Sequence, residues 1–238
     1  MKTIRFGAED LTLDPDRAVA WDSRRVLLIA DTHFGKDATA RALGMPVPSG
    51  ALQTDLDRLE QIASRHGARE IWVLGDVFDS KAAGDPKTIE TIRDFLARTG
   101  VTLSMVPGNH DRNVRHIAEA AGIRWFPSGT SIGPFVLTHE PLAIPSERPR
   151  LCGHVHPGTI LRGPGRERLR AACFWQGRGE LILPAFGTWT GLALIRPQPG
   201  DQVWAAAAGR VIECPVNSPV RPAVGTVRQA PARGRDLD

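Results

Sequence analysis

The first half of the chain alternates between two hydrophobic patterns. Short, almost continuous apolar runs indicate strands that are buried on both faces, and apolar residues that recur every three or four positions indicate amphipathic helices. Strands are expected at residues 26–30, 71–74 and 101–106, and helices at residues 50–66, 88–98 and 114–121. Gly100 is expected to end the second helix. Because a helix lies between successive strands, we expect these strands to pair in parallel through helical crossovers.

Short strand-like runs open the chain, around residue 4 and at residues 11–13 and 18–21. The second half contains short strand-like segments separated by glycine and proline, a pattern typical of antiparallel sheet. They occur at residues 135–138, 150–153, 159–161, 169–175, 180–183, 191–195, 203–207 and 211–214. We therefore expect an α/β fold with two sheets and with helices outside at least one of them, in a single domain over residues 1–214. Residues 215–238 lack periodicity and are expected to form a flexible tail rich in proline and arginine.

Composition and charge narrow the class of protein. Of 238 residues, 42% are hydrophobic and 24% are charged, which is ordinary for a folded protein. No apolar run reaches the roughly 18 residues that span a bilayer, and the first ten residues lack an apolar leader segment, so we expect a cytoplasmic protein with no membrane partner. The net charge of +4 is compatible with a polyanionic partner but is weak evidence for one. The three cysteines are widely spaced, which argues against a disulfide framework or a CxxC site.

Polar residues gather immediately after the predicted strands. The segments are Asp-Thr-His at 31–33, Gly-Asp-Val-Phe-Asp at 75–79, Gly-Asn-His-Asp at 108–111, Thr-His-Glu at 138–140 and Gly-His-Val-His at 153–156. Any one segment could be an ordinary turn, but together they hold five of the seven histidines. In the last segment, alternation would aim His154 and His156 to the same side if the backbone is extended. Ligands bind at the carboxyl ends of strands in α/β sheets, and imidazole and carboxylate groups suit divalent transition metals, so we expect a metal site.

In their order along the chain, these segments resemble the sequence blocks of the calcineurin-like metallophosphoesterase superfamily, over residues 26–195. The resemblance implies a four-layer sandwich of two mixed β-sheets flanked by helices, with two divalent metal ions at the strand ends. It implies that the first ion is bound by Asp31, His33 and His156, that the second is bound by Asn109, His139 and His154, and that Asp76 bridges both. Two such ions can clamp a phosphoryl group and lower the pKa of a water molecule, so that a hydroxide attacks the phosphoester.

Catalytic roles beyond the metals follow from the same resemblance. His110 is expected to contact the scissile phosphate or to protonate the leaving group. Asp79 is a candidate for orienting His110 through a hydrogen bond, although it could equally be a turn residue. Arg112 is a candidate catalytic contact to the phosphate.

Candidates for holding the substrate are basic and aromatic residues near these segments. Lys36 and Arg41 are candidate phosphate contacts, and Phe34, Trp189 or Arg41 could stack on or pair with a base. Each of them also has an ordinary explanation, because loop cations are usually solvated and aromatic residues are usually in the core.

The residues around the metal-binding blocks narrow the resemblance further. Residues 31–36, 41–50, 74–80, 152–157 and 183–191 are similar to the bacterial ligase-associated DNA-damage-response endonucleases, although Leu192 stands where that family has glycine. The similarity implies a manganese-dependent DNA endonuclease of DNA repair that acts on single-stranded or structured ends, in functional association with a DNA ligase and a helicase. Iron, zinc or cobalt would suit the same ligands.

Two alternatives remain open at this point. The same metal site could hydrolyse nucleotides or other small phosphodiesters. The chain could instead be a non-catalytic scaffold of the same fold, although the complete ligand set and His110 argue against a decayed site.

Overall fold

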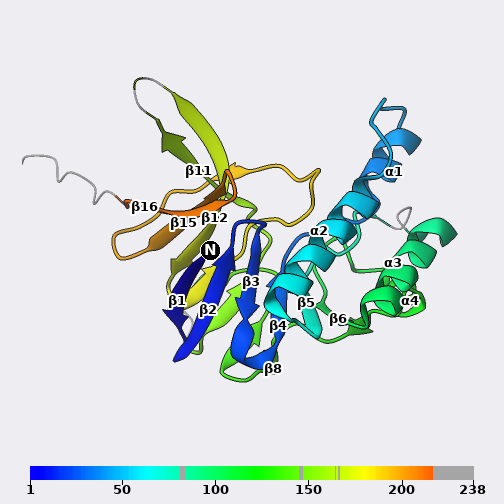
Figure 1. The fold of residues 1–238 in the computed structure, drawn as a ribbon, viewed down its shortest axis with the longest axis horizontal. Coiled ribbons are helices and arrows are strands. Elements are labelled where there is room, and N and C mark those ends of the chain that lie inside the picture. The colour runs from blue at the N-terminus through cyan, green and yellow to red at the C-terminus, as the bar shows by residue number, and fades with distance from the viewer. Residues whose placement is uncertain (81–83, 145–146, 164, 166, 217–238) are drawn as a thin grey trace, which may run out of the picture.

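The computed structural model describes residues 1–80, 84–144, 147–163, 165 and 167–216, and it places the strands in two sheets (Figure 1). The strands of the first sheet are β1 (Lys2–Phe6), β2 (Glu9–Asp14), β3 (Ala18–Trp21), β4 (Val26–Ile29), β5 (Glu70–Leu74), β6 (Thr102–Val106) and β7 (Arg124–Trp125), and they lie side by side in chain order. A 3₁₀-helix, η1 (Asp22–Arg24), joins β3 to β4. The strands from β1 to β4 pair antiparallel, and those from β4 to β7 pair in parallel, as predicted for β4, β5 and β6.

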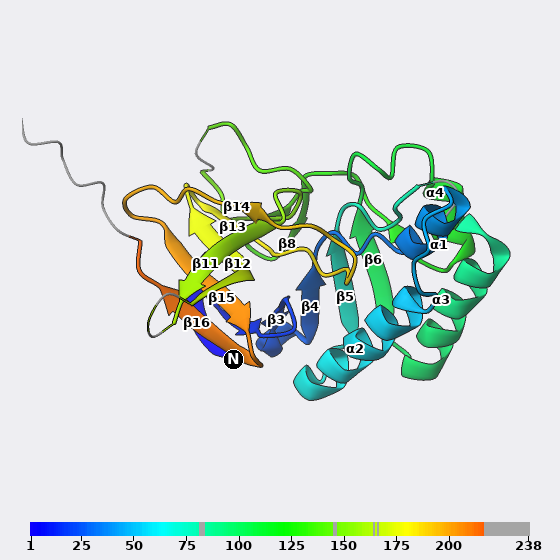
Figure 2. The same ribbon diagram turned by 90° about the horizontal axis from the view of Figure 1, so that it is seen from above.

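The α-helices of the described residues lie beside the first sheet, on the side away from the second sheet (Figures 1 and 2). They are α1 (Lys36–Ala42), α2 (Ala51–His66), α3 (Pro86–Thr99) and α4 (Arg115–Ala120). Local sequence explains α3, because the Asp85 side chain accepts hydrogen bonds from backbone N–H groups of the first turn and Gly100 closes the last turn with a left-handed backbone. α1 was not predicted, because its only apolar residues are alanines.

The second sheet is mixed. Its strands are β8 (Thr130–Ile132), β9 (Phe135–Leu137), β10 (Arg150–Cys152), β11 (Pro157–Arg162), β12 (Arg168–Gly177), β13 (Glu180–Ile182), β14 (Ala193–Leu194), β15 (Gln202–Ala207) and β16 (Arg210–Cys214). The order is β14-β11-β12-β13-β10-β9-β8, with β15 between β12 and β16. The prediction of antiparallel pairing is correct for β11, β12, β15 and β16, but β10 pairs in parallel with both β9 and β13. Between two parallel strands, the connecting chain must cross back to the end of the sheet where the first strand began. The hydrophobic pattern of a short strand does not indicate such a connection.

Two hydrophobic cores lie on opposite faces of the first sheet, because successive residues of a strand point to opposite faces. Leu27 and Ile29 of β4 belong to the core beneath α2, α3 and α4, whereas Leu28 belongs to the core between the two sheets. The second sheet contributes Phe174 and Leu181, among other residues, to that inner core. The expected α/β arrangement of two mixed sheets flanked by helices is thereby confirmed, with the described helices on the first sheet.

Other expectations have mixed outcomes. β7 and β8 were not predicted because they are too short to show a pattern, and the strand expected at 191–195 is reduced to the two residues of β14. Cys152, Cys173 and Cys214 are unpaired, in agreement with their spacing. None of the helices in the described part of the chain is both long and apolar enough to cross a bilayer. The predicted flexible tail lies outside the described residues beyond residue 216.

Candidate metal centre

Strands of both sheets end at the same place. β4, β5 and β6 are followed by Asp31, Asp76 and Asn109, and β9 and β10 are followed by His139 and His154. Hydrogen bonds continue the parallel pairing past the strand ends, since the N–H of His33 donates to the Asp76 carbonyl at 2.9 Å and that of Gly153 donates to the His139 carbonyl at 2.9 Å. The polar segments that the sequence places after separate strands are therefore neighbours in space.

Five of the predicted metal ligands have a left-handed backbone, which residues with a side chain rarely adopt. The φ angles are +53° at Asp31, +44° at His33, +49° at Asp76, +70° at His154 and +48° at His156. Residues in this conformation persist only where the surroundings hold them, and they concentrate at functional sites. An extended backbone at 153–156 would aim His154 and His156 to the same side, but the segment has a left-handed backbone at both histidines, and they belong to different clusters.

Three glycines of the polar segments are required by close contacts, and one of them is Gly108, where a Cβ atom would collide with Oδ1 of Asp76. A Cβ atom on Gly75 would collide with the His139 ring, and the backbone of Gly75 is itself left-handed with φ of +77°. A Cβ atom on Gly153 would lie 2.6 Å from Oδ2 of Asp31. Glycine therefore lets the backbone of one segment approach a metal-ligand candidate of another.

The first cluster contains Asp31, His33 and His156, the three residues predicted to bind the first ion. One ligand atom of each lies within 4.8 Å of the others, and Nε2 of His156 is 3.6 Å from Oδ1 of Asp31. Both ring nitrogens of His33 are buried without a hydrogen-bond partner among the described residues. Burial and the nearby Lys36 lower the pKa of His33 to about 4, so the ring is neutral at physiological pH and can donate a lone pair.

The second cluster contains Asp76, His139 and His154, with Asn109 beside them. One ligand atom from each of the first three lies within 4.8 Å of the others. Nε2 of His139 lies 3.0 Å from Oδ1 of Asn109 and 3.0 Å from Nδ1 of His154. Nδ1 of His139 lies 3.0 Å from the Leu74 carbonyl, and this contact orients the ring so that Nε2 faces the cluster.

Asp76 links the two clusters. Its Oδ2 is 3.4 Å from Nε2 of His139 and 3.9 Å from Nε2 of His33. Burial acts to raise the pKa of Asp76, but His139 and the backbone N–H of His110 lower it to about 2, so the carboxylate is ionised. Burial likewise acts to lower the pKa of His139, and the charges of Asp76 and Asp31 raise it to about 9. The two carboxylates thus create a place where a positive charge is favoured.

His110 lies next to the first cluster, with its ring centre 5.1 Å from that of His33. Its Nδ1 is 2.9 Å from the backbone carbonyl of Asp79. The hydrogen bond expected from Asp79 is therefore made by the main chain rather than by the carboxylate. The Asp79 carboxylate lies 3.5 Å from Nδ1 of His33 and 3.6 Å from Nζ of Lys36.

Of the arginines predicted to contact the phosphate, one lies beside the clusters and the other does not. Arg112 is exposed and lines a cavity of about 360 Å³ together with Asn109 and His139. Arg41 is not brought to the clusters, because its guanidinium donates to the Asp37 carboxylate at 3.1 Å and lines a different cavity. The expectation that Arg41 contacts the phosphate finds no support in this placement.

Of the two aromatic residues predicted to stack on a base, one is buried and the other is exposed. Phe34 belongs to the core beneath the helices and is 1% exposed, so it is not available to stack on a base. Trp189 is 41% exposed and lines a small hollow with His33 and Lys36. Trp189 therefore remains a candidate for contact with a ligand at the first cluster.

Asp111 supports the site in a way that sequence analysis left unassigned. It is fully buried, and its carboxylate accepts hydrogen bonds from the backbone N–H groups of Val77, Phe78 and Gly108 at 3.1, 3.2 and 2.9 Å. These bonds join the loop after β5 to the loop after β6. The only signal in the sequence was the aspartate that closes the Gly-Asn-His-Asp segment.

Replacing Asp111 with alanine is expected to lower the free energy of unfolding by about 3 kcal/mol, because buried N–H groups lose their acceptor. Urea denaturation measures the change. Asp111→Asn keeps one acceptor oxygen and is expected to be less destabilised. An alanine variant as stable as the parent protein would show that the carboxylate does not hold the two loops together.

Two charged residues of α2 anchor the loop at residues 185–190. From the sequence pattern they were only polar residues of an amphipathic helix, with no predicted partner. The carboxylate of Asp55 accepts hydrogen bonds from the N–H and hydroxyl of Thr188 at 3.1 and 2.5 Å. The guanidinium of Arg58 donates to the Phe186 carbonyl and lies 4.0 Å above the Phe186 ring. The loop that carries Trp189 is thus tied to the helix layer.

Comparison with known proteins agrees with this geometry. A family model described as calcineurin-like phosphoesterase matches residues 24–154, more than half of the chain. The crystal structure of nuclease MPE from Pseudomonas putida is similar to this structure with a TM-score of 0.75 and 33% sequence identity, covering 90% of this chain and 99% of that one. No curated protein matches the chain. The chain belongs to the calcineurin-like phosphoesterase family and is a metal-dependent phosphoesterase.

Proposed function

We propose that the chain is a nuclease that hydrolyses DNA phosphodiester bonds with two divalent metal ions. Asp31, His33 and His156 would hold the first ion, and His139, His154 and Asn109 the second, with Asp76 shared. The observation that carries the proposal is the pair of clusters joined through Oδ2 of Asp76, which lies 3.9 Å from His33 and 3.4 Å from His139.

The donor atoms of the clusters fit such ions. They are imidazole nitrogens, carboxylate oxygens and one amide oxygen, a set that suits manganese as well as iron, zinc or cobalt. The buried ring nitrogens of His33, which have no hydrogen-bond partner among the described residues, are groups that need one in a folded protein. The carboxylate of Asp31 is fully buried and, within the described part of the chain, accepts a hydrogen bond only from the backbone N–H of His154, at 2.9 Å, so its charge favours a cation beside it. Ions bound there would polarise the phosphate and lower the pKa of an attacking water molecule.

The chain's own residues have separate tasks. Asp76 offsets the repulsion between two cations because its charge is shared by both clusters. The Asp79 carbonyl accepts the hydrogen bond of His110 Nδ1, which leaves Nε2 of that exposed ring to contact a phosphate oxygen or to protonate the leaving oxygen. Lys36 beside His33 and Arg112 beside Asn109 supply positive charge on two sides of the clusters.

DNA as substrate is supported by the likeness to the Pseudomonas putida protein, which is described as a nuclease. Exposed Arg112 and Trp189 beside the clusters are the residue types that hold a single strand, through phosphate pairing and base stacking. We extend the proposal to manganese as the native metal, to single-stranded or structured ends, and to a role in DNA repair beside a ligase and a helicase.

A metal-dependent nuclease assay tests the proposal. Purified protein with manganese would be given linear single-stranded, duplex and hairpin DNA, free nucleotides and an aryl phosphodiester at equal metal concentration. We expect cleavage of single-stranded DNA, and about 10²-fold slower cleavage by His110→Ala. Turnover of nucleotides without cleavage of DNA would favour the small-substrate alternative. Inertness toward every substrate after metal loading would favour the scaffold.

Metal binding is also expected to stabilise the fold. An ion that binds only the folded chain stabilises it by about 2.7 kcal/mol at one hundred times its dissociation constant. The midpoint of thermal unfolding should therefore rise on adding manganese and fall on adding a chelator. A His33→Ala variant should show a smaller rise. An unchanged midpoint at saturating manganese would argue against a preformed ion site.

A further inference from the structure

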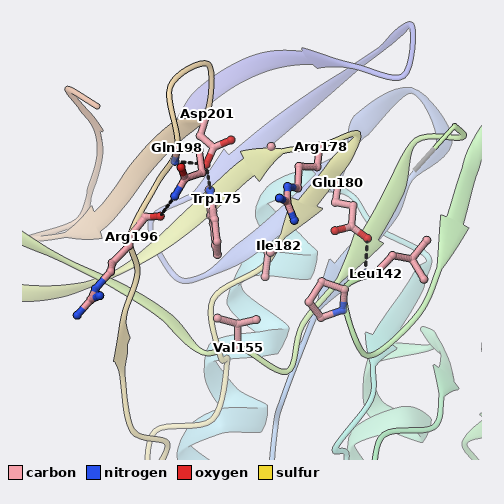
Figure 3. A pocket seen from close by; sticks show the side chains of 11 residues that line it. Leu142, Val155, Trp175, Arg178, Glu180, Ile182, Arg196, Gln198 and Asp201 are labelled. Carbon is pink, nitrogen blue, oxygen red and sulfur yellow. Dashed lines mark hydrogen bonds between the residues drawn. The ribbon is translucent and has the colours of Figure 1, made fainter. Parts of the chain in front are cut away.

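A second cavity lies on the face of the second sheet that points away from the inner core. Phe174 and Leu181 face the inner core, so their neighbours Trp175 and Ile182 face the opposite side. There they line a cavity of about 390 Å³, which we name the outer cavity (Figure 3). This volume lies in the range of about 300–1,000 Å³ that is typical of small-ligand sites.

The outer cavity adjoins the metal centre, because the two share lining residues. One of its lining residues is Val155, which stands between the metal-ligand candidates His154 and His156. Two others, Pro141 and Leu142, also line the cavity that contains Asn109, His139 and Arg112. A chain molecule whose phosphate lies at the metals therefore meets the outer cavity directly past these residues.

The lining has the chemistry of a nucleotide site. Figure 3 shows the Trp175 indole near Ile182 and Val155, with Leu142 on the other side and the Arg178 guanidinium between them. The indole is held in place, since its Nε1 donates to Oδ2 of Asp201 at 2.9 Å. A fixed aromatic plane beside a guanidinium can stack on a base and pair with its phosphate.

The acidic groups of the outer cavity already have partners. Oε1 of the buried Glu180 accepts the Leu142 N–H at 2.9 Å and lies 3.4 Å from Nε of Arg150. Oδ2 of Asp201 accepts the Gln198 N–H at 2.7 Å in addition to the indole of Trp175. Two exposed arginines of this lining, Arg178 and Arg196, offer a charge to an anionic ligand. Figure 3 shows the Arg178 guanidinium on the side of Trp175 and Ile182, whereas the Arg196 guanidinium points away from them, so Arg178 is the one placed to pair with a nucleotide stacked on the indole.

We propose that the outer cavity binds one nucleotide of the DNA strand that is cut at the metal centre, with its base stacked on Trp175 and a phosphate paired with Arg178. The proposal rests on the proposed nuclease function. It makes the enzyme selective for a strand with an unpaired base next to the scissile bond, because a base within a duplex cannot reach the indole.

Steady-state kinetics on two substrates test the proposal. Trp175→Leu is expected to raise KM for a single-stranded oligonucleotide about tenfold, the loss of one stacked base, and Arg178→Asn about fivefold. The kcat/KM for an aryl phosphodiester, which is too small to reach the outer cavity, should stay within about twofold of the parent value. Retained hydrolysis of this small substrate also shows that each variant is folded.

A matched control is available for the arginine. Arg25 is exposed and has a left-handed backbone with φ of +55°, as Arg178 does with φ of +54°, but it lies at the start of β4, away from the strand ends that carry the ligands. Arg25→Asn is expected to leave both substrates unaffected. Equal losses in Arg178→Asn and Arg25→Asn would mean that overall charge rather than the cavity is responsible.

Photocrosslinking adds a readout that needs no variant. An oligonucleotide with 5-iodouracil next to the scissile position is expected to crosslink to the peptide that contains Trp175. Crosslinks confined to other peptides, or an unchanged KM in Trp175→Leu, would overturn the proposal while leaving the nuclease function intact. A parent protein that hydrolyses the aryl phosphodiester but does not cut DNA would overturn the nuclease function itself.

Discussion

Asp76→Asn is expected to slow hydrolysis of an aryl phosphodiester by about 10³-fold, because several kcal/mol of metal-derived stabilisation of the transition state are lost. The substitution removes the charge that both clusters share and keeps Oδ1, which accepts the His110 N–H at 2.9 Å. Steady-state kinetics measure the rate. Metal analysis of the purified variant should find fewer than two ions per chain.

Asp14→Asn is the matched control. Asp14 is also a fully buried carboxylate, but it lies at the end of β2 and its partners are Arg65 at 2.8 Å and His66 at 3.0 Å in α2, neither of which is a metal-ligand candidate. This variant should unfold at lower denaturant concentration and still bind two ions. If Asp76→Asn kept full activity and two bound ions, the proposal that Asp76 bridges the two ions would be wrong.

Gly75→Ala is expected to lower the free energy of unfolding by about 3 kcal/mol and to abolish most of the activity. The left-handed backbone contributes about 1–2 kcal/mol of the loss, and the collision with His139 contributes about 1–3 kcal/mol. Activity falls because the His139 ring must move away from Asn109 and His154. Thermal unfolding and kinetics on the aryl phosphodiester measure the two effects.

Gly100→Ala separates the backbone effect from the collision. Gly100 has a similar φ of +65°, at the end of α3, and an added Cβ atom would meet nothing within 4 Å. We expect the backbone penalty alone, with unchanged kcat. If the two alanine variants lost stability and activity to the same degree, the close approach of Gly75 to His139 would be irrelevant.

The secondary structure of the first half was predictable because its signals are local. Continuous apolar runs marked β4, β5 and β6, and spacing of three or four residues marked α2 and α3. Pairing in the second sheet was less accessible, since β9 and β10 are short and their parallel arrangement depends on the path of the loop between them. That same parallel pairing brings His139 and His154 to one edge.

For the candidate site, the grouping of the metal ligands was predictable from the sequence, but the partners of the neighbouring residues were not. Resemblance grouped Asp31 with His33 and His156, and the structure brings these side chains together. It did not predict that the Asp79 backbone rather than its carboxylate meets His110, or that Arg41 is occupied by Asp37. Such partners are set by backbone direction at residues that are distant in sequence.

The amino-acid sequence by itself determined where the strands of the first sheet end and which ligand-type side chains follow them, because burial and strand length leave a local pattern. Only the tertiary structure decided that Asp111 joins two loops, that Asp55 anchors the loop of Trp189, and that the outer cavity adjoins the ligand segments. Each of these depends on backbones that meet after folding, and a polar residue in a loop has the same appearance in the sequence whichever partner it finds.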